Sequence, residues 1–191
     1  MRSSTQISAL GLRLIACTLT HVEAELEAPE TLAALLGVGP ISHNWPPGDY
    51  DREAQCFFRD RLREGGKAAV GWYGWYGVVP EQPVEGIRTA PEGSGQPVLV
   101  GACGYFGPPD ETGGVALGYS VLPEWTGQGL ATGMAALLVE HAFSFPVVTQ
   151  ITAETTRQNI ASQKVLRKVG FLLQPAEPGT DMLHYILPRR A

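Results

Sequence analysis

The stretch PEWTGQGLATG, residues 123–133, decides the fold of this chain, because it joins two apolar segments of different periodicity. The segment before it, VALGYSVL at residues 115–122, is β-branched, aromatic and apolar, which predicts a buried strand. After it, apolar residues recur at helical spacing as far as Phe145, which predicts a helix of about four turns. The stretch is therefore a glycine-rich turn from a strand into a helix, a place where unpaired backbone N–H groups can bind an anion.

Two common phosphate-binding patterns do not fit this turn. A dinucleotide-binding fingerprint has the spacing G-x-G-x-x-G after an early strand, whereas Gly127, Gly129 and Gly133 are spaced differently and follow several predicted strands. A P-loop ends in Gly-Lys followed by Ser or Thr, and the turn contains no lysine. Taken alone, the glycines are equally well explained as residues of a tight turn that needs positive φ angles.

A second segment with a polar helix start lies downstream, in TTRQNIASQKVLRKVGF at residues 155–171. It places Asn159 and Ser162 one turn apart at the beginning of a helix that follows a predicted strand. Asn159 is also explained as a helix cap, with Ser162 incidental. Each segment alone is weak evidence of a binding site, but the two together, in this order and spacing, are strong evidence.

With both segments in this order, the chain resembles the GCN5-related N-acetyltransferase (GNAT) superfamily, and most closely its branch of ribosomal-protein alanine/serine N-acetyltransferases. The acyl-CoA loop of that family, [Gln/Arg]-x-x-Gly-x-[Gly/Ala], matches TGQGLA at residues 126–131, with Thr126 in the first position. LGYSVLPEWTGQGLAT and AETTRQNIASQKVLRKVGF look like its two cofactor motifs, and LGLRLIACTLTHVEAEL is similar to its opening strand and helix. The resemblance therefore covers nearly the whole chain.

The remaining periodicities agree with an α/β fold that has a mixed sheet. The predicted elements are strand 11–18, helix 23–37 with a new turn at Pro29, helix 50–63, strands 68–79, 98–106 and 115–122, a helix ending near 145, strand 147–154, helix 158–169, and strands 171–173 and 182–187. Their order is β-α-α-β-β-β-α-β-α-β-β, with helices on both faces and, as the resemblance implies, a splayed central sheet. Residues 1–191 form a single domain, within which residues 80–97, with four prolines and three glycines, form an exposed loop.

The resemblance implies that acetyl-CoA is the co-substrate. Its pyrophosphate would bind the backbone amides of the turn at the positive end of the following helix, and its pantetheine arm would pair with the strand before the turn. Asn159 would hydrogen-bond that arm, and Lys164 is either a contact for the 3′-phosphate or part of a solvated helix face. The expected cofactor-binding residues are Val121, Leu122, Pro123, Thr126, Gly127, Gln128, Gly129, Leu130, Ala131, Thr132, Asn159 and Ser162.

The implied reaction is aminolysis of a thioester, in which the amine loses a proton, the carbonyl oxygen gains charge and a thiolate leaves. A main-chain N–H near Leu122 would meet the developing oxyanion. Many relatives carry a tyrosine as the proton donor to the thiolate, but Leu166 stands at that position here, so Ser162 is the candidate donor.

The general base is less clear from the sequence. Relatives often carry a glutamate at the position of Ala116, so Glu154 becomes the acidic candidate, with His43 and Asp49 as further candidates on the acceptor side. A chain of waters without a dedicated base is also reasonable, because an α-amino group with a pKa of about 8 is partly neutral already.

Composition excludes several other classes of protein. A net charge of −5 argues against nucleic acid, which requires a basic face. Cys17, Cys56 and Cys103 are odd in number and form no C-x-x-C pair, so neither structural zinc nor a disulfide framework is expected, and a reducing cytoplasm fits better. No run approaches the roughly 20 apolar residues of a membrane span. Residues 14–17, LIAC, resemble a lipoprotein cleavage site, but Arg13 interrupts the apolar stretch, and a first strand explains them better.

We therefore predict an N-acetyltransferase that acts on a primary amine, either a protein N-terminus or a small molecule, as a monomer or homodimer and without a metal. The alternative is a catalytically silent acyl-CoA-binding module, which Ala116 and Leu166 would suit because relatives carry chemistry at those positions. Turnover of acetyl-CoA with any amine separates the two hypotheses.

Overall fold

The computed structural model describes residues 6–9, 11–80, 95–175 and 179–190, so all but the ends of the predicted loop 80–97 lies outside the described residues. The strands are β1 Gln6–Ala9, β2 Leu12–Ala16, β3 Gly74–Val79, β4 Val98–Tyr105, β5 Gly114–Val121, β6 Gln150–Thr156, β7 Leu172–Leu173 and β8 Met182–Pro188. The helices are α1 Leu19–Glu27, α2 Pro29–Leu36, α3 Arg52–Gly65, α4 Leu130–Phe143 and α5 Ile160–Val169. Among these, no helix is long and apolar enough to cross a membrane.

The strands form one mixed sheet in the order β1-β2-β3-β4-β5-β6-β8-β7. Every neighbouring pair is antiparallel except β5 and β6, which are parallel and are connected through α4. This connection is the β-α-β crossover predicted around the glycine turn, because parallel neighbours need a long connection, usually a helix. The predicted α/β fold with a mixed sheet is confirmed.

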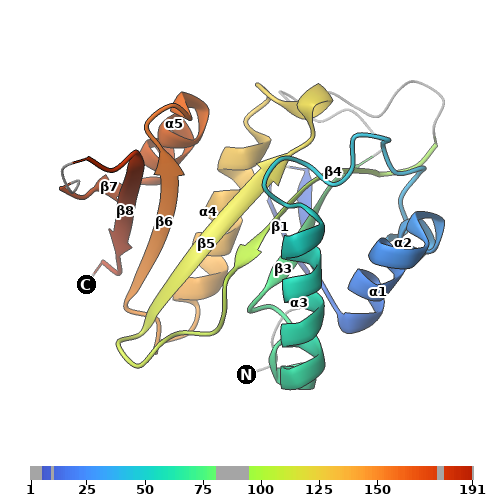
Figure 1. The fold of residues 1–191 in the computed structure, drawn as a ribbon, viewed down its shortest axis with the longest axis horizontal. Coiled ribbons are helices and arrows are strands. Elements are labelled where there is room, and N and C mark those ends of the chain that lie inside the picture. Colours follow the sequence, from blue (N-terminus) through green and yellow to red (C-terminus); the bar gives the residue numbers. More distant parts are fainter. Residues whose placement is uncertain (1–5, 10, 81–94, 176–178, 191) are drawn as a thin grey trace.

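The two parallel strands in the middle of the sheet stay together for only a short distance. Residues 114–116 of β5 pair with residues 150–152 of β6. Beyond them the two strands continue to Val121 and Thr156 without pairing with each other. Figure 1 shows the two strands diverging toward the ends that lead into α4 and α5. The splay that the resemblance implied is therefore present.

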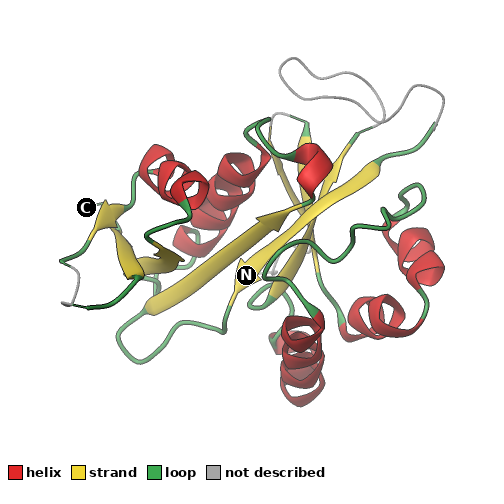
Figure 2. Ribbon diagram, turned by 45° about the horizontal axis from the view of Figure 1, so that its top comes forward, coloured by secondary structure: helices red, strands yellow, loops and turns green. Residues whose placement is uncertain are grey.

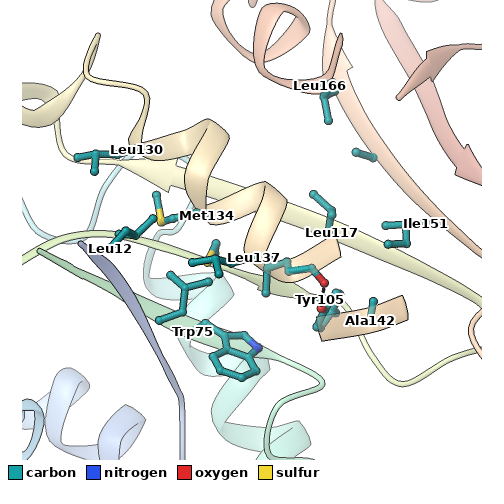
Figure 3. Packing of buried hydrophobic residues seen from close by; sticks show 14 of the residues in the cluster. Leu12, Trp75, Tyr105, Leu117, Leu130, Met134, Leu137, Ala142, Ile151 and Leu166 are labelled. Atoms are coloured by element: carbon teal, nitrogen blue, oxygen red, sulfur yellow. Dashed lines mark hydrogen bonds between the residues drawn. The ribbon is translucent and has the colours of Figure 1, made fainter. Parts of the chain in front are cut away.

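Helices cover both faces of the sheet, as predicted (Figure 2). Alternation along β2 and β3 explains the two layers, since Leu14 and Trp75 belong to the same core as α4, whereas Tyr76 packs in a second core with residues of α1 and α2. Figure 3 shows Met134 and Leu137 of α4 beside the apolar side chains of the first core. Helix α5 contacts α4 and β6, so it lies on the α4 face.

The N-terminal half differs from the prediction in two places. Strand β1 was missed: it forms a hairpin with β2 through Gly11, whose φ of 80° suits a tight turn. The predicted helix 23–37 is two helices, because Thr18 caps α1 and Pro29 begins α2 after a non-helical Ala28.

Three other predictions need correction in the same way. The predicted strand 68–79 begins only at Gly74, because residues 66–68 form a 3-10 turn after α3. The strand predicted from residue 147 begins at Gln150. The apolar residues of the predicted helix 50–63, Phe57, Phe58 and Leu62, are expected to face inward, but Phe57 keeps 41% of its surface exposed.

Candidate active site

The turn before α4 is built to leave backbone N–H groups available. Gly127 and Gly129 both have a φ of 78°, and a Cβ on either would meet no atom within 4 Å. Gly129 is the N-cap of α4, and no side chain caps this helix. The first bond within the helix runs from the Gly133 N–H to the Gly129 carbonyl (2.9 Å), so the N–H groups of residues 130–132 precede the hydrogen-bonded ladder. These N–H groups and the positive end of the helix dipole fit a pyrophosphate.

The other expected residues of the turn are placed around these N–H groups. Thr126 is exposed, and its Oγ1 donates to the Pro123 carbonyl (2.9 Å). Gln128 is half-buried between the two glycines, and Leu130 packs in the core at 3% exposure. Ala131 and Thr132 form the first turn of α4 and are half-buried.

The main chain of β5 presents alternate residues to the place where β5 and β6 diverge. The Leu122 N–H donates to the Val100 carbonyl on β4 (2.9 Å), and successive residues of a strand direct their N–H and C=O groups to opposite sides. The main-chain groups of Tyr119 and Val121 therefore face β6 beyond the paired residues, whereas Leu117 flanks the last pair, Ala116 with Thr152. A pantetheine arm carries amide groups that can pair with such a strand edge.

This alternation corrects part of the sequence analysis. The N–H of Leu122 is bonded to β4, and its carbonyl accepts from the Trp125 N–H (2.9 Å), so among the main-chain donors near Leu122 the N–H of Val121 is the one left to meet an oxyanion. The Pro123 carbonyl already accepts from Thr126. Of the three residues expected to meet the pantetheine arm, only Val121 directs its main chain toward the diverging strands.

Asn159 acts as the N-cap of α5. Its Oδ1 accepts from the Ser162 N–H (3.0 Å), which is the capping role that the sequence had left open. The buried Gln163 fixes the preceding turn by donating from Nε2 to the carbonyls of Thr156 (3.2 Å) and Arg157 (2.9 Å). The Asn159 side chain is thus held in the turn between β6 and α5, while Lys164 is exposed along the helix.

The structure adds a residue that sequence reasoning missed. The Tyr119 hydroxyl lies 3.0 Å from Ser162 Oγ and 3.2 Å from the Ser162 carbonyl, so it connects β5 to α5 across the diverging strands. Burial raises the pKa of Tyr119, partly offset by the Ser162 hydrogen bond, so the phenol stays protonated near neutral pH. A signal was available in the sequence, because Tyr119 is a polar aromatic between two small residues, Gly118 and Ser120, just before the turn.

The structure separates the two predicted catalytic residues. Glu154 is exposed on β6, and its Oε1 lies 3.1 Å from Nδ1 of His184, the residue opposite on β8. Ile151 and Ala153 of the same strand pack in the core with α4. Since side chains alternate along a strand, Glu154 lies on the opposite face from these two residues. Glu154 therefore faces away from α4, whereas Ser162 lies on α5 on the α4 side of the sheet.

A loop on the Glu154 side of the sheet approaches β5. A Cβ on Gly48 would lie 3.3 Å from Ser120 Oγ, so residues 41–50 reach β5, one of the two diverging strands. His43 and Asp49, the other candidate bases, are both exposed on this loop. We call residues 41–50 the acceptor-side loop.

The acceptor-side loop is anchored by Glu25 of α1, a buried carboxylate that sequence reasoning also missed. Glu25 is 6% exposed, burial raises its pKa, and four side-chain donors counter part of that rise. These donors are Tyr76 OH (2.6 Å), Trp45 Nε1 (2.7 Å), Tyr50 OH (2.8 Å) and Gln55 Nε2 (2.9 Å). No group of three or more His, Cys, Asp or Glu residues that could hold a metal is found in the described part of the chain.

The family follows from comparison with known proteins. A family model described as an acetyltransferase (GNAT) domain matches residues 18–172. The chain belongs to the GNAT family. It is 30% identical over 129 residues to the uncharacterized N-acetyltransferase YjdG of Bacillus subtilis, covering 68% of this chain and 67% of YjdG. Acetyl transfer is the activity that these matches support.

Solved structures share the fold along nearly the whole chain. An acetyltransferase of Agrobacterium tumefaciens aligns with a TM-score of 0.60 at 18% identity, covering 99% of this chain and 97% of that one. RimL, a ribosomal L7/L12 α-N-protein acetyltransferase in complex with CoA, aligns with a TM-score of 0.60 at 17% identity, covering 96% and 97%. The acetyltransferase MccE, in complex with acetyl-CoA and AMP, aligns at 0.58 and 12% identity, covering 94% and 93%.

Proposed function

We propose that this GNAT protein transfers an acetyl group from acetyl-CoA to a primary amine, either a protein N-terminus or a small molecule. The observation that carries the proposal is the uncapped start of α4 beside two diverging strands, one of which directs main-chain groups between them. RimL and MccE, which share the fold, were solved with CoA and with acetyl-CoA. A pyrophosphate at residues 127–132 would lead the pantetheine arm along Tyr119 and Val121, with the Asn159 amide as a further donor.

Acetyl-CoA supplies a thioester whose carbon–sulfur bond breaks as the amine bonds to the carbonyl carbon. The sulfur leaves with the electron pair and needs a proton. We infer that Ser162 donates it, and that Tyr119, whose hydroxyl lies 3.0 Å from Ser162 Oγ, donates in turn to that oxygen and directs the serine proton toward the sulfur. With the Leu122 N–H bonded to β4, the Val121 N–H is the main-chain donor that could meet charge on the carbonyl oxygen.

The amine would approach from the face opposite α4. There β5 presents only small side chains, Ala116, Gly118 and Ser120, and an acceptor would lie beside them next to the exposed ring of Phe106, which lies against Gly118. Glu154 and His184 lie on this same face as a close pair, with Oε1 and Nδ1 3.1 Å apart, so the imidazole or carboxylate could accept the proton that the amine loses. Donor chemistry on one face and acceptor chemistry on the other explain why the two catalytic candidates do not meet.

A screen of primary amines, peptides with free N-termini and aminoglycosides tests the proposal. We expect acetyl-CoA consumption and an acetylated product of mass +42 Da, about one acetyl group per amine. If acetyl-CoA binds but no member of a broad amine panel is acetylated, the silent acyl-CoA-binding module becomes the better hypothesis. If acetyl-CoA does not bind, both hypotheses are wrong.

A further inference from the structure

The acceptor-side loop is hydrogen-bonded to Glu124, just before the glycine-rich turn, as well as to Glu25 in the core. Ser42 Oγ donates to Glu124 Oε1 (2.5 Å), and Asn44 Nδ2 donates to Glu124 Oε2 (3.1 Å). The Asn44 N–H also donates to Ser42 Oγ (3.2 Å), which holds the two loop residues in one arrangement. Both oxygens of a single carboxylate thus bind residues that lie 82 and 80 positions away in the chain.

Glu124 stands directly before the turn that would hold the pyrophosphate. It belongs to the 3-10 turn Pro123–Trp125, in which Trp125 is buried and its N–H donates to the Leu122 carbonyl (2.9 Å). The Ser42 hydrogen bond lowers the pKa of Glu124, so the carboxylate is ionised at neutral pH and its hydrogen bonds are charge-assisted. Only Trp125 separates Glu124 from Thr126, the first residue of the glycine-rich turn.

The loop is held firmly at its other end. Trp45 and Tyr50 donate to the buried Glu25, and Gly48 lies against Ser120 on β5. Because the Glu25 anchor lies in the core and the Glu124 anchor on the surface, the surface anchor is the one that ligand binding can strengthen or release.

We propose that Glu124 is a positioning residue that couples the cofactor site to the acceptor site. When a pyrophosphate fixes residues 126–132, Glu124 is fixed with them and holds Ser42 and Asn44, which orders the acceptor-side loop against β5. The amine site is then complete only when the cofactor is bound. This inference rests on the proposed function, because it assumes that residues 126–132 bind CoA and that residues 41–50 border the amine.

Hydrogen exchange measured by mass spectrometry, with and without CoA, tests the coupling without an acceptor. In the unmodified protein, CoA should slow exchange in peptides covering residues 126–132 and also residues 41–50. In Glu124→Gln, which lacks the negative charge and keeps only one of the two acceptor oxygens, CoA should still protect residues 126–132 but protect residues 41–50 less. Glu111→Gln removes the same charge from the exposed turn between β4 and β5 and should behave as the unmodified protein.

The outcomes distinguish a failure of the proposed coupling from a failure of the proposed cofactor site. Equal protection of residues 41–50 by CoA in Glu124→Gln and in the unmodified protein would overturn the coupling. No protection of residues 126–132 in the unmodified protein would instead overturn the proposed cofactor site.

A double-mutant cycle gives a kinetic test once an acceptor is found. Glu124→Gln and the pair Ser42→Ala with Asn44→Ala should each raise the KM for the amine by at least about fivefold, the lower range of coupling between sites. The value of kcat should change little, and combining the changes should add nothing further, because both remove the same contact. Additive losses, or a fall in kcat with KM unchanged, would contradict the positioning role.

Discussion

Glu25 illustrates what a single buried carboxylate requires. A carboxylate removed from water is costly unless hydrogen-bond donors replace the solvent, and Trp45, Tyr50 and Tyr76 are three of the four donors that do so here. Two of the four donors come from the acceptor-side loop, one from β3, and the fourth, Gln55, from α3. Glu25 therefore fixes the position of the acceptor-side loop from the core. The desolvation cost of its carboxylate is offset only when all of these donors are in place.

The charge of Glu25 should be visible in the pH dependence of stability. Its folded pKa is raised above the unfolded value of about 4.3, so its contribution to the free energy of unfolding is full below that value and is lost as pH rises through the folded pKa. Glutamine carries no titrating proton, so the unfolding free energy of the protein minus that of Glu25→Gln should fall as pH rises from 4. Denaturant unfolding at a series of pH values measures this difference. A difference that rises with pH would mean that the hydrogen bonds outweigh burial.

Tyr119 and Ser162 should act as a unit in acetyl transfer. Ser162→Ala should slow single-turnover transfer by about 10²-fold, since it removes a proton donor to the leaving thiolate. Tyr119→Phe should slow it by about fivefold, equivalent to about 1 kcal/mol for one hydrogen bond. The acetyl-CoA dissociation constant, measured by calorimetry, should move little in either variant.

The combined Tyr119 and Ser162 variant is the control for this pair. It should be no slower than Ser162→Ala alone, because Tyr119 is inferred to act only through Ser162. If Ser162→Ala transfers acetyl at the unmodified rate, water protonates the thiolate and Ser162 is a helix residue without a catalytic role.

At the scale of elements, the best predictions came from segments that carry two independent signals. The strand before the glycine turn, α4 and α5 each combine periodicity with a cap or turn residue, and their bounds agree with the structure to within two residues. Strand β1 has only four residues, QISA, and is stabilised by its pairing with β2 rather than by its own pattern. The segment 68–73 is aromatic enough for a strand, but the 3-10 turn after α3 leads the chain to Gly74.

The candidate site was predictable only where local sequence determines it. The glycines of the turn and the Asn159 cap act through their own backbone, so their placement follows from a few neighbouring residues. The contacts between Tyr119 and Ser162 and between Glu124 and Ser42 join residues 43 and 82 positions apart. Such contacts depend on the packing of whole elements, and a single sequence gives no register for them. The direction of the Leu122 N–H could not be predicted for the same reason, since it depends on pairing with β4.

Alternation along β5 gives a test at the scale of one strand. If the pantetheine arm pairs with this strand, CoA should slow amide hydrogen exchange at Tyr119 and Val121, whose N–H groups face β6 beyond the paired residues. Gly118 and Ser120 face β4, and their exchange should be slow already and change little. Residue-resolved exchange by NMR, with and without CoA, measures the alternation. Uniform protection along β5 would indicate a general tightening of the sheet in place of direct pairing.

At the scale of the whole molecule, the chain consists of two parts of one sheet that are joined weakly. In the described part of the chain, strands β1–β5 and strands β6–β8 pair at three positions between β5 and β6, and α4 and the Tyr119–Ser162 contact also connect the two parts. The proposed cofactor site lies where these parts diverge, so a bound CoA would contact β5, α4 and α5 together. Ligand binding at such a site should stabilise the molecule as a whole.

CoA and acetyl-CoA should therefore raise the unfolding temperature. A ligand present at 100 times its dissociation constant adds about 2.7 kcal/mol, which for a chain of this length corresponds to roughly 5–10 °C. Gly129→Glu, which places bulk and negative charge at the phosphate turn, should weaken CoA binding by more than tenfold, or about 1.4 kcal/mol, and should lose most of the shift. Gly129→Ala is the matched control, because any side chain at a φ of 78° is strained, but alanine adds no charge. Differential scanning fluorimetry with each ligand measures the shifts, and a Gly129→Glu variant that is folded and still shifts fully would place the phosphates elsewhere.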